Sequence, residues 1–265
     1  MSIHRLLVPT LLAVVAAGCI NSATLISVKA DGSGTVEQTL LVNQSAAKMM
    51  FGAPGGGGAP DGPVVNTADL ERAAERMGGV RFVSAEPLTR GAFAGVKALY
   101  AFDDINTVQV SQDPQMSGSS SGGLTTATSA SSPVRFTWAR GASSSVLTVT
   151  FDQAPGAAAG AEPADPPEMP DPQMLGMMKS MFEGFKVAID LQVDGTIVRT
   201  NADWVTGSRV TLLEMDLSAL LDDQARLAEL QKSMTPGASF SDVRPLLKGV
   251  KGIKVNEPVV TIEYR

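Results

Sequence analysis

The chain has 265 residues, of which 44% are hydrophobic and 5% aromatic, and its formal net charge is −6 at neutral pH. This acidic balance argues against nucleic acid as a partner, because phosphate backbones attract basic surfaces. It also argues against binding to anionic lipid through overall charge. The length fits one or two domains, although the 26 glycines and 16 prolines gather in patches that reduce the part able to pack.

The first residues predict a cleaved export signal. Arg5 supplies a positive charge, residues 6–17 are almost entirely apolar, and Ala-Ala-Gly then precedes Cys19. The apolar run is too short to cross a bilayer whose hydrocarbon core is about 30 Å thick. Its flanking charge and small residues are typical of a signal peptide. We therefore expect residues 1–18 to be removed.

A signal that ends in small residues followed by cysteine resembles the lipobox of bacterial lipoproteins. The resemblance implies a lipid anchor on Cys19, with palmitate-type acyl chains on its thiol and on the new amino terminus. Cys19 is the only cysteine, which excludes an intramolecular disulfide. We expect residues 19–23 to form a short lipidated tether on the non-cytoplasmic side of the cell envelope, at the periplasmic face of the outer membrane or at the cell surface. An ordinary signal peptide with an incidental cysteine is the alternative.

Residue types in the mature chain argue against catalysis. The only histidine, His4, lies in the leader, which excludes Ser-His-Asp and Cys-His mechanisms and zinc sites built from His or Cys. Residues 118–122 match G-x-S-x-G but lie in a Gly/Ser tract without a histidine base. Ser45 and Lys48 match S-x-x-K, so a Ser/Lys hydrolase is the weakest alternative. We predict no catalytic residues, no metal and no cofactor.

Two other clusters are candidates for binding. Acidic pairs at 103–104 and 222–223, and the acids between 162 and 171, lack the spacing of a calcium loop and are interpreted as solvated surface. Four methionines between residues 174 and 181 recur at helical spacing, which predicts a stripe packed on its own domain. A contact surface for a partner or lipid, or a Cu(I) site, are the alternatives for this stripe.

The segment 24–152 predicts an N-terminal α+β part. Its expected elements are a hairpin within 24–42 around Asp31-Gly32-Ser33-Gly34, a helix from Asn66 or Thr67 to Met77, strands at 80–86 and 94–102, and a hairpin of strands 134–139 and 146–152. Composition predicts disordered loops at 52–63 and 113–132, and a Pro-rich linker at 153–173.

The segment 174–265 predicts a C-terminal α+β part, which either stands alone or shares one sheet with the first. Its expected elements are a helix at 174–182, strands at 185–193, 196–202 and 209–215, helices at 217–234 and 241–248, and a strand at 259–264. Asp194-Gly195 is the strongest hairpin signal in the chain. Residues 26–39 and 189–200 share a strand, Asp-Gly, strand pattern, which indicates either related halves or simple recurrence.

Short turns between strands favour antiparallel pairing, so we predict an α+β fold with a mainly antiparallel sheet built from hairpins and a few helices on one face. The early Asp-Gly hairpin after Cys19 is vaguely similar to LppM-type lipoproteins. These observations predict a membrane-anchored envelope lipoprotein that acts as a non-enzymatic structural or interaction module, with the membrane and an envelope protein as partners. A lipoprotein that binds a lipid or another apolar ligand is the alternative.

Overall fold

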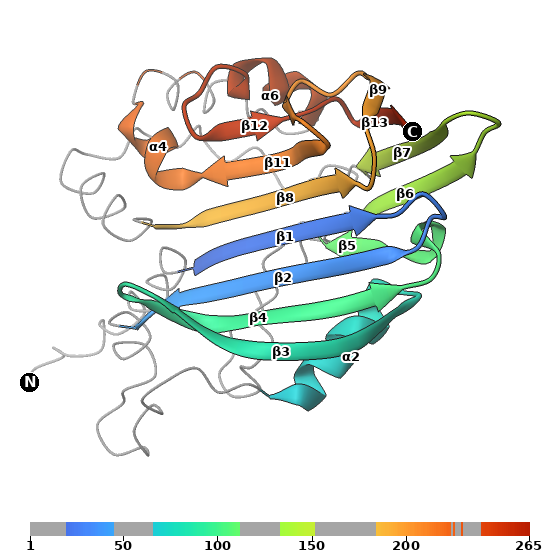
Figure 1. Ribbon diagram of the computed structural model, residues 1–265. Helices are drawn as coiled ribbons and strands as arrows, with labels where there is room; N and C mark the ends of the chain where they lie inside the picture. The colour runs from blue at the N-terminus through green and yellow to red at the C-terminus, as the bar shows by residue number, and fades with distance from the viewer. Residues whose placement is uncertain are drawn as a thin grey trace, which may run out of the picture.

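The computed structural model describes residues 20–44, 66–111, 133–151, 184–223, 225, 229 and 240–265. Within these residues the strands form two sheets, which we call sheet A and sheet B (Figure 1). Sheet A contains β1 (Ile20–Val28), β2 (Gly34–Asn43), β3 (Val80–Arg90), β4 (Phe93–Phe102), β8 (Lys186–Val193), β10 (Val205–Thr206), β11 (Arg209–Asp216) and β12 (Ile253–Val255). Sheet B contains β5 (Gln109–Ser111), β6 (Pro133–Arg140), β7 (Ser145–Phe151), β9 (Ile197–Thr200) and β13 (Val259–Tyr264).

The order of sheet A places β1 and β8 at its centre. The order is β10-β11-β8-β1-β2-β4-β3. β12 also pairs with β11, along residues 213–215, whereas β10 pairs with residues 209–210. β1 and β8 run parallel, whereas the other described neighbours in both sheets run antiparallel. Strands from both sides of residues 152–183 therefore lie next to each other in sheet A, and the same is true of sheet B.

The core lies between the two sheets. Alternate residues of β1 and β2, such as Ile26, Val28 and Val36, are fully buried, and they share one apolar cluster with Leu147 and Ile262 of sheet B. This is the expected outcome for strands with one apolar face, because a second sheet buries that face efficiently. The predicted strand-dominated α+β fold is confirmed, although the sequence patterns did not anticipate that the strands divide between two packed sheets.

Helices are few in the described part of the chain. They are α2 (Thr67–Met77), α4 (Leu217–Asp222), α6 (Phe240–Leu247) and the 3₁₀ helix η2 (Ile105–Thr107). α2 begins where predicted, because the Asn66 side chain accepts a hydrogen bond from the Ala68 N–H. It buries Ala74 and Met77. None of the described helices is long and apolar enough to cross a membrane.

Two predicted hairpins are confirmed, and the two strands predicted at 80–86 and 94–102 also pair with each other. β1 pairs with β2, β3 with β4, and β6 with β7, each antiparallel. The strand predicted at 80–86 is longer in the structure, because β3 runs to Arg90. Pro87 is tolerated there because β3 is an edge strand, where a missing N–H breaks no ladder.

The predicted hairpin around Asp194-Gly195 is wrong. β8 stays in sheet A, whereas β9 pairs with β13 in sheet B, so the Asp-Gly turn carries the chain from one sheet to the other. β8 already pairs with β1 on one edge and with β11 on the other. No edge of β8 is left for β9, which also means that residues 189–200 do not repeat the hairpin formed within 26–39.

The long helix expected at 217–234 is not continuous. α4 ends at Asp222, and Asp223 caps it with a non-helical backbone and an N–H donated to the Leu220 carbonyl. The helix expected at 241–248 is confirmed as α6, and the closing strand as β13. Residues 20–23, expected in the tether, belong to β1. Several other predictions lie outside the described residues: the leader, Ser45 and Lys48, the loops at 52–63 and 113–132, the G-x-S-x-G match, the linker at 153–173 and the methionine stripe.

Candidate functional site

A crevice of about 350 Å³ opens outside the carboxyl ends of the parallel strands β1 and β8. At this point β1 turns into β2 within sheet A, while β8 leaves for sheet B (Figure 1). Crevices at the carboxyl ends of strands whose connections diverge are common ligand sites in open sheets that contain parallel strands. Its lining is Ser27, Val28, Lys29, Gly34, Thr35, Gln192, Val193, Asp194, Gly195 and Ser208.

The crevice has an apolar floor and a polar rim. Val28 and Val193 are almost fully buried, and the Asp194 N–H donates to the Val28 carbonyl at 2.8 Å, which ties the two strand ends together. Lys29 and Asp194 are exposed at the rim, and within the described residues neither side chain has a hydrogen bond or an ion pair. The rim thus carries one cation, whose charge also acts on the Asp31 carboxylate, and one anion, together with hydroxyl and amide groups.

The first wall is the turn that joins β1 to β2. Gly32 has φ of +86°, and a Cβ atom there would lie 2.8 Å from the Trp138 ring of β6. The Trp138 Nε1–H donates to the Tyr264 hydroxyl at 2.9 Å, and that hydroxyl donates to the Lys29 carbonyl at 3.1 Å. The turn therefore rests against sheet B, which requires glycine at its point of closest approach.

The second wall is the turn after β8, and the end of β13 also holds it. Thr196 and Arg265 exchange two backbone hydrogen bonds, of 2.8 and 3.1 Å. Gly195 has φ of +157°, and a Cβ atom there would lie 2.6 Å from the Arg265 carbonyl oxygen. Residues 264–265 therefore fasten both walls of the crevice, although the two turns belong to strands far apart in sequence.

The pKa of the Tyr264 phenol depends both on its burial and on the charges around the crevice. Burial raises the pKa of its phenol, the hydrogen bond from Trp138 opposes this, and the carboxylates of Asp31 and Asp194 raise the pKa further. Asp31 itself accepts hydrogen bonds from the backbone N–H and the hydroxyl of Ser33, which lower the pKa of its carboxyl. At neutral pH the tyrosine is therefore a neutral donor and acceptor that joins the two sheets.

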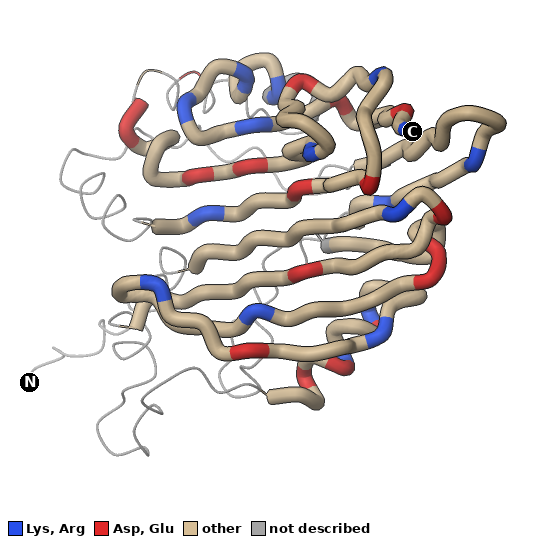
Figure 2. Tube along the Cα trace, viewed as in Figure 1, with Lys and Arg blue, Asp and Glu red and all other residues tan. Residues whose placement is uncertain are grey.

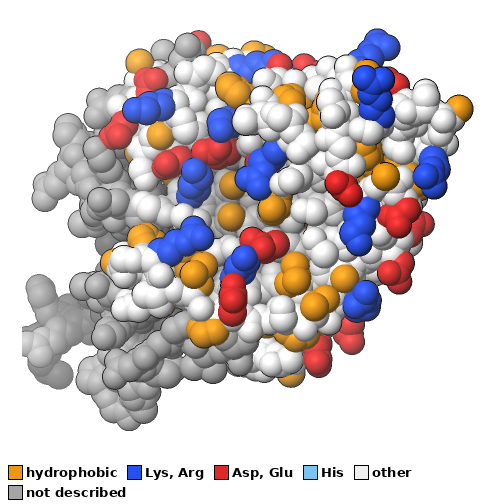
Figure 3. Space-filling model, in the orientation of Figure 1, with side chains coloured by type: hydrophobic (Ala, Val, Ile, Leu, Met, Phe, Trp, Pro, Cys, Tyr) orange, Lys and Arg blue, Asp and Glu red, His pale blue; other side chains and the backbone are white. Residues whose placement is uncertain are grey.

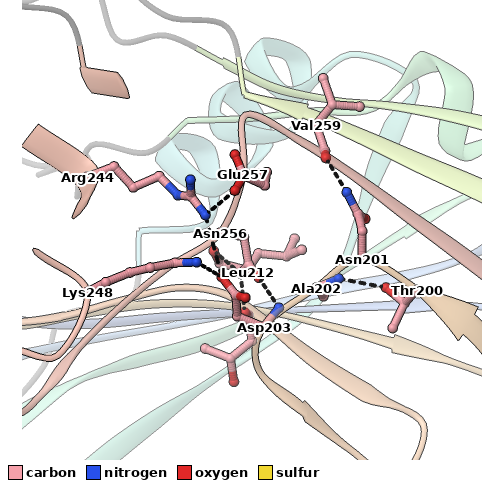
Figure 4. A network of polar contacts seen from close by, with 11 residues as sticks. Thr200, Asn201, Ala202, Asp203, Leu212, Arg244, Lys248, Asn256, Glu257 and Val259 are labelled. Carbon is pink, nitrogen blue, oxygen red and sulfur yellow. Dashed lines mark hydrogen bonds and ion pairs between the residues drawn. The ribbon is translucent and has the colours of Figure 1, made fainter. Parts of the chain in front are cut away.

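A second polar cluster surrounds Asn256, which follows β12 (Figure 4). The Asn256 amide is buried; its Nδ2 donates to the Thr211 and Leu212 carbonyls at 2.8 and 2.9 Å, and its Oδ1 accepts from the Asp203 N–H at 2.8 Å. These carbonyls lie at the irregularity of β11 between Thr211 and Leu213. Asn256 thus completes the hydrogen bonding of a β-bulge, which is a structural role.

Ion pairs extend this cluster to α6. Arg244 lies 2.5 Å from a Glu257 carboxylate oxygen and 3.5 Å from one of Asp203, and Lys248 lies 2.8 Å from the same Asp203 oxygen. Two cations and two anions therefore fasten α6 to the loops before β10 and after β12. Each charge has an opposite partner, and we interpret the cluster as a brace, although the buried Arg244 Nε and Nη2 atoms have no hydrogen-bond partner among the described residues.

The outer face of sheet A, turned toward the viewer in Figures 2 and 3, mixes charged and aliphatic side chains. On this face Glu214 lies 2.9 Å from Lys186 and 2.8 Å from Lys254, and Lys97 lies 2.8 Å from Glu37. Burial opposes the charge of Glu214, but its two lysine partners outweigh this effect and lower the pKa of its carboxyl. Lys97 therefore has a carboxylate partner in Glu37, whereas Lys186 and Lys254 share the single carboxylate of Glu214.

Of the residues considered from the sequence, only some can be placed. Asp104 caps η2, since its carboxylate accepts from the Asn106 backbone at 3.0 Å and side chain at 2.6 Å, so it has the structural role expected of a surface acid. Cys19 lies outside the described residues, directly before β1. Among the described residues no group of His, Cys, Asp or Glu is close enough to hold a metal ion. The sequence reasoning missed the crevice; the two Asp-Gly turns were the signal that could have found it.

Comparison with known proteins identified no family. No family model matches the chain, and no curated protein does. A search of solved structures found the NMR structure of the folded domain of the Mycobacterium tuberculosis LppM protein. It is 10% identical in sequence, with a TM-score of 0.37, over 94% of this chain and 91% of that chain. We draw no conclusion about function from a likeness at this level.

Proposed function

We propose that this protein is a lipid-anchored lipoprotein of the bacterial envelope that acts, without catalysis, as an interaction module. The observation that carries the proposal is the apolar leader that ends in Ala-Ala-Gly-Cys, with Cys19 as the only cysteine of the chain. The start of β1 at Ile20 supports it, because a folded body that begins one residue after Cys19 fits an anchor placed directly on that body. Acylation of the thiol and the amino terminus would supply the lipid chains needed for stable membrane attachment.

The crevice supports the role of an interaction module. It is open, its rim carries the exposed charges of Lys29 and Asp194, and a backbone hydrogen bond joins the two strand ends that form it. Opposite charges on an open rim suit a polar partner, such as an exposed loop of another envelope protein, because complementary charges steer and orient association. The absence of histidine from the mature sequence supports the non-catalytic part of the proposal.

The anchor is tested by mass spectrometry of the mature amino terminus in a bacterium that processes lipoproteins. We expect an acylated Cys19 as the first residue, and flotation of the protein with membranes. Cys19→Ser should leave the leader uncut or cut elsewhere and remove the acyl mass. An unmodified amino terminus downstream of Cys19 in the unaltered protein would exclude the lipoprotein assignment.

The crevice is tested by crosslinking in native membranes. Lys29→Gln and Asp194→Asn remove these charges and should reduce capture of the partner, while the melting temperature stays the same. Arg81→Gln on the edge strand β3, also an exposed cation, is the matched control and should leave capture unchanged. Equal capture by all three variants would place the interaction surface elsewhere.

A further inference from the structure

A row of outward side chains crosses sheet A near the middle of its long strands. The strand registers pair its members neighbour to neighbour, one each from β3, β4, β2, β1, β8, β11 and β12, and in that order they are Glu86, Lys97, Thr39, Ala23, Ala188, Glu214 and Lys254. In β1 the alternate residues Ile26 and Val28 are buried between the sheets, so Ala23 lies on the outer face with its row. We call these residues the outer row.

The charges of the outer row reverse their order on the two sides of β1. None of the nine residues of β1 is charged (Figure 2). On the side of β2, Lys97 lies on the second strand from β1 and Glu86 on the third. On the side of β8, Glu214 lies on the second strand and Lys254 on the third. A half-turn about β1 therefore brings each of these charges over a charge of opposite sign.

The ion pairs around the outer row leave an unbalanced charge on each side of β1. On the side of β2 one cation lies between two carboxylates, a group that we call the acidic triad: Lys97, which is 2.8 Å from Glu37 and 3.9 Å from Glu86. On the side of β8 one carboxylate lies between two cations, the basic triad: Glu214, which is 2.9 Å from Lys186 and 2.8 Å from Lys254. The Glu86 and Lys254 side chains are 68% and 36% exposed, so both triads are accessible.

We infer that the outer face of sheet A binds the same face of a second copy of this chain, in a symmetric dimer whose two-fold axis runs along β1. In this dimer the acidic triad of each copy meets the basic triad of the other, and two-fold symmetry makes the contact twice. Lys97 faces the partner's Glu214, and Glu86 faces the partner's Lys254. The inference goes beyond the proposed function and does not depend on the anchor at Cys19.

The dimer has the geometry of two stacked sheets. Sheets that pack face to face lie about 10 Å apart and keep their strands within about 30° of each other. A two-fold axis along β1 leaves the strands of both copies running in the same direction, which is this aligned arrangement. Ala23 and Leu25 lie on the axis and are partly exposed. They form an apolar centre between the charges of the triads, as is typical of protein interfaces.

One contact of this dimer brings like charges together. Leu25 on the axis is paired with Glu37 on one side and with Asp190 on the other, so Asp190 faces the partner's Glu37. Asp190 accepts a hydrogen bond from the Thr211 hydroxyl at 2.7 Å, and Lys97 lies 2.8 Å from Glu37. Each carboxylate thus has a polar partner of its own. Because the two carboxylates still repel each other, Asp190→Asn should strengthen the dimer.

The area of the face is sufficient for a dimer of modest stability. Six strands about 4.8 Å apart, over five residues of about 3.3 Å each and their margins, give roughly 600 Å² on each copy. Specific interfaces bury about 1,200–2,000 Å² in total, so this contact lies at the lower end of the range. We therefore expect the dimer to dissociate on dilution.

The aligned arrangement also places the two crevices. Each crevice lies at the carboxyl ends of β1 and β8, and the strands of both copies run in the same direction. Both crevices therefore open at the same end of the dimer. A partner with two matching loops binds both at once, which strengthens the complex without any new contact.

The test uses two copies of the full-length chain that carry different tags and are expressed together. We expect the two tags to co-purify after mild solubilisation. Lys97→Glu in both copies, or Glu214→Lys in both copies, places like charges opposite each other twice and should reduce co-purification about tenfold or more. Arg140→Glu, a charge reversal at an exposed position of sheet B, is the matched control and should have no effect. Separate unaltered copies would overturn the inference.

The mixed pair of variants is the decisive measurement. With Lys97→Glu in one copy and Glu214→Lys in the other, every contact between positions 97 and 214 again joins opposite charges, so co-purification should return. If the mixed pair stayed apart while both variants kept the melting temperature of the unaltered chain, the proposed pairing would be wrong. Glu86→Lys mixed with Lys254→Glu repeats the test at the ends of the outer row, in case either inner variant fails to fold.

Crosslinking locates the contact between the copies. Thr39 and Ala188 occupy matching places on the two sides of β1, so Thr39 of one copy faces the partner's Ala188. A short bismaleimide should join Thr39→Cys in one copy to Ala188→Cys in the other. It should not join two copies with Ala139→Cys, an exposed position of sheet B, and the unaltered chain controls for Cys19. Crosslinks at residue 139 without those between 39 and 188 would overturn the inference.

Discussion

Two Asp-Gly turns follow two neighbouring parallel strands, yet they lead the chain to different places. Asp31-Gly32 joins β1 to β2 and closes a hairpin within sheet A. Asp194-Gly195 follows β8, which lies beside β1 in parallel register, but the next strand, β9, joins sheet B. Similar local sequences therefore give a hairpin in one case and a crossing between sheets in the other.

The difference lies in which strand edges are free. β1 has β8 on one side and leaves its other edge to β2, the strand that follows. β8 has β1 on one side and β11 on the other, so β9 must pair elsewhere and finds β13. A turn sequence sets how sharply the chain reverses, but the availability of hydrogen-bonding edges decides where the next strand pairs.

The largest expected effect comes from the residue that joins the first turn to sheet B. Tyr264→Ala should lower the free energy of unfolding by about 3–5 kcal/mol, because it removes a buried aromatic ring and leaves a cavity. Tyr264→Phe keeps the ring and loses only the hydroxyl that bridges Trp138 and Lys29, so it should cost about 1–2 kcal/mol. Urea denaturation measures both. If Tyr264→Ala lowered the free energy of unfolding by less than Tyr264→Phe does, the ring would not be part of the core.

Substitution of the turn glycines by alanine should be equally destabilising in both turns, although the two turns lead the chain to different sheets. Gly32→Ala and Gly195→Ala each combine positive φ with a contact under 3 Å, to Trp138 or to Arg265, so each should cost about 2–4 kcal/mol. Gly207→Ala is the control, because Gly207 has φ of +62° but nothing within 4 Å of the added Cβ. It should cost about 1 kcal/mol. If Gly195→Ala matched Gly207→Ala, the second turn would not be held against β13.

The pairing between β8 and β11 can be weakened by a substitution at the bulge of β11. Asn256→Ala removes the amide that satisfies the Thr211 and Leu212 carbonyls at the bulge of β11, and it should cost about 2–3 kcal/mol. Hydrogen exchange should then increase along the pair of β8 and β11 and stay unchanged in the β1–β2 hairpin. Exchange that increases equally in both would show that the two regions open together.

The smallest effect concerns alkaline pH. Burial raises the pKa of both tyrosines of the chain, Tyr100 and Tyr264. The folded state therefore holds these protons more tightly than the unfolded state does, so stability is complete below about pH 10 and is lost as the pH rises through the folded-state pKa. Tyrosinate absorbance and denaturation, followed together, measure this. Normal titration of both phenols in the folded protein would contradict it.

Local patterns in the sequence determined much of the fold. Strand segments and the turn residues between them predicted β1, β2, β6, β7 and β13, and the helix predicted from Asn66 or Thr67 to Met77 is α2. These elements follow from interactions within a few residues, such as capping, turn chemistry and the two-residue period of a strand. The leader and the cysteine that support the lipid anchor are also features of the sequence alone.

Only the tertiary structure decided how these elements combine. The parallel pairing of β1 with β8, the division into two sheets and the path of the chain after Asp194-Gly195 depend on contacts between residues far apart in the sequence. The crevice is built from the same contacts, because its walls meet only when Tyr264 and Arg265 reach both turns. No local pattern encodes such a meeting, since it depends on which strand edges and apolar faces remain free after the nearer contacts have formed.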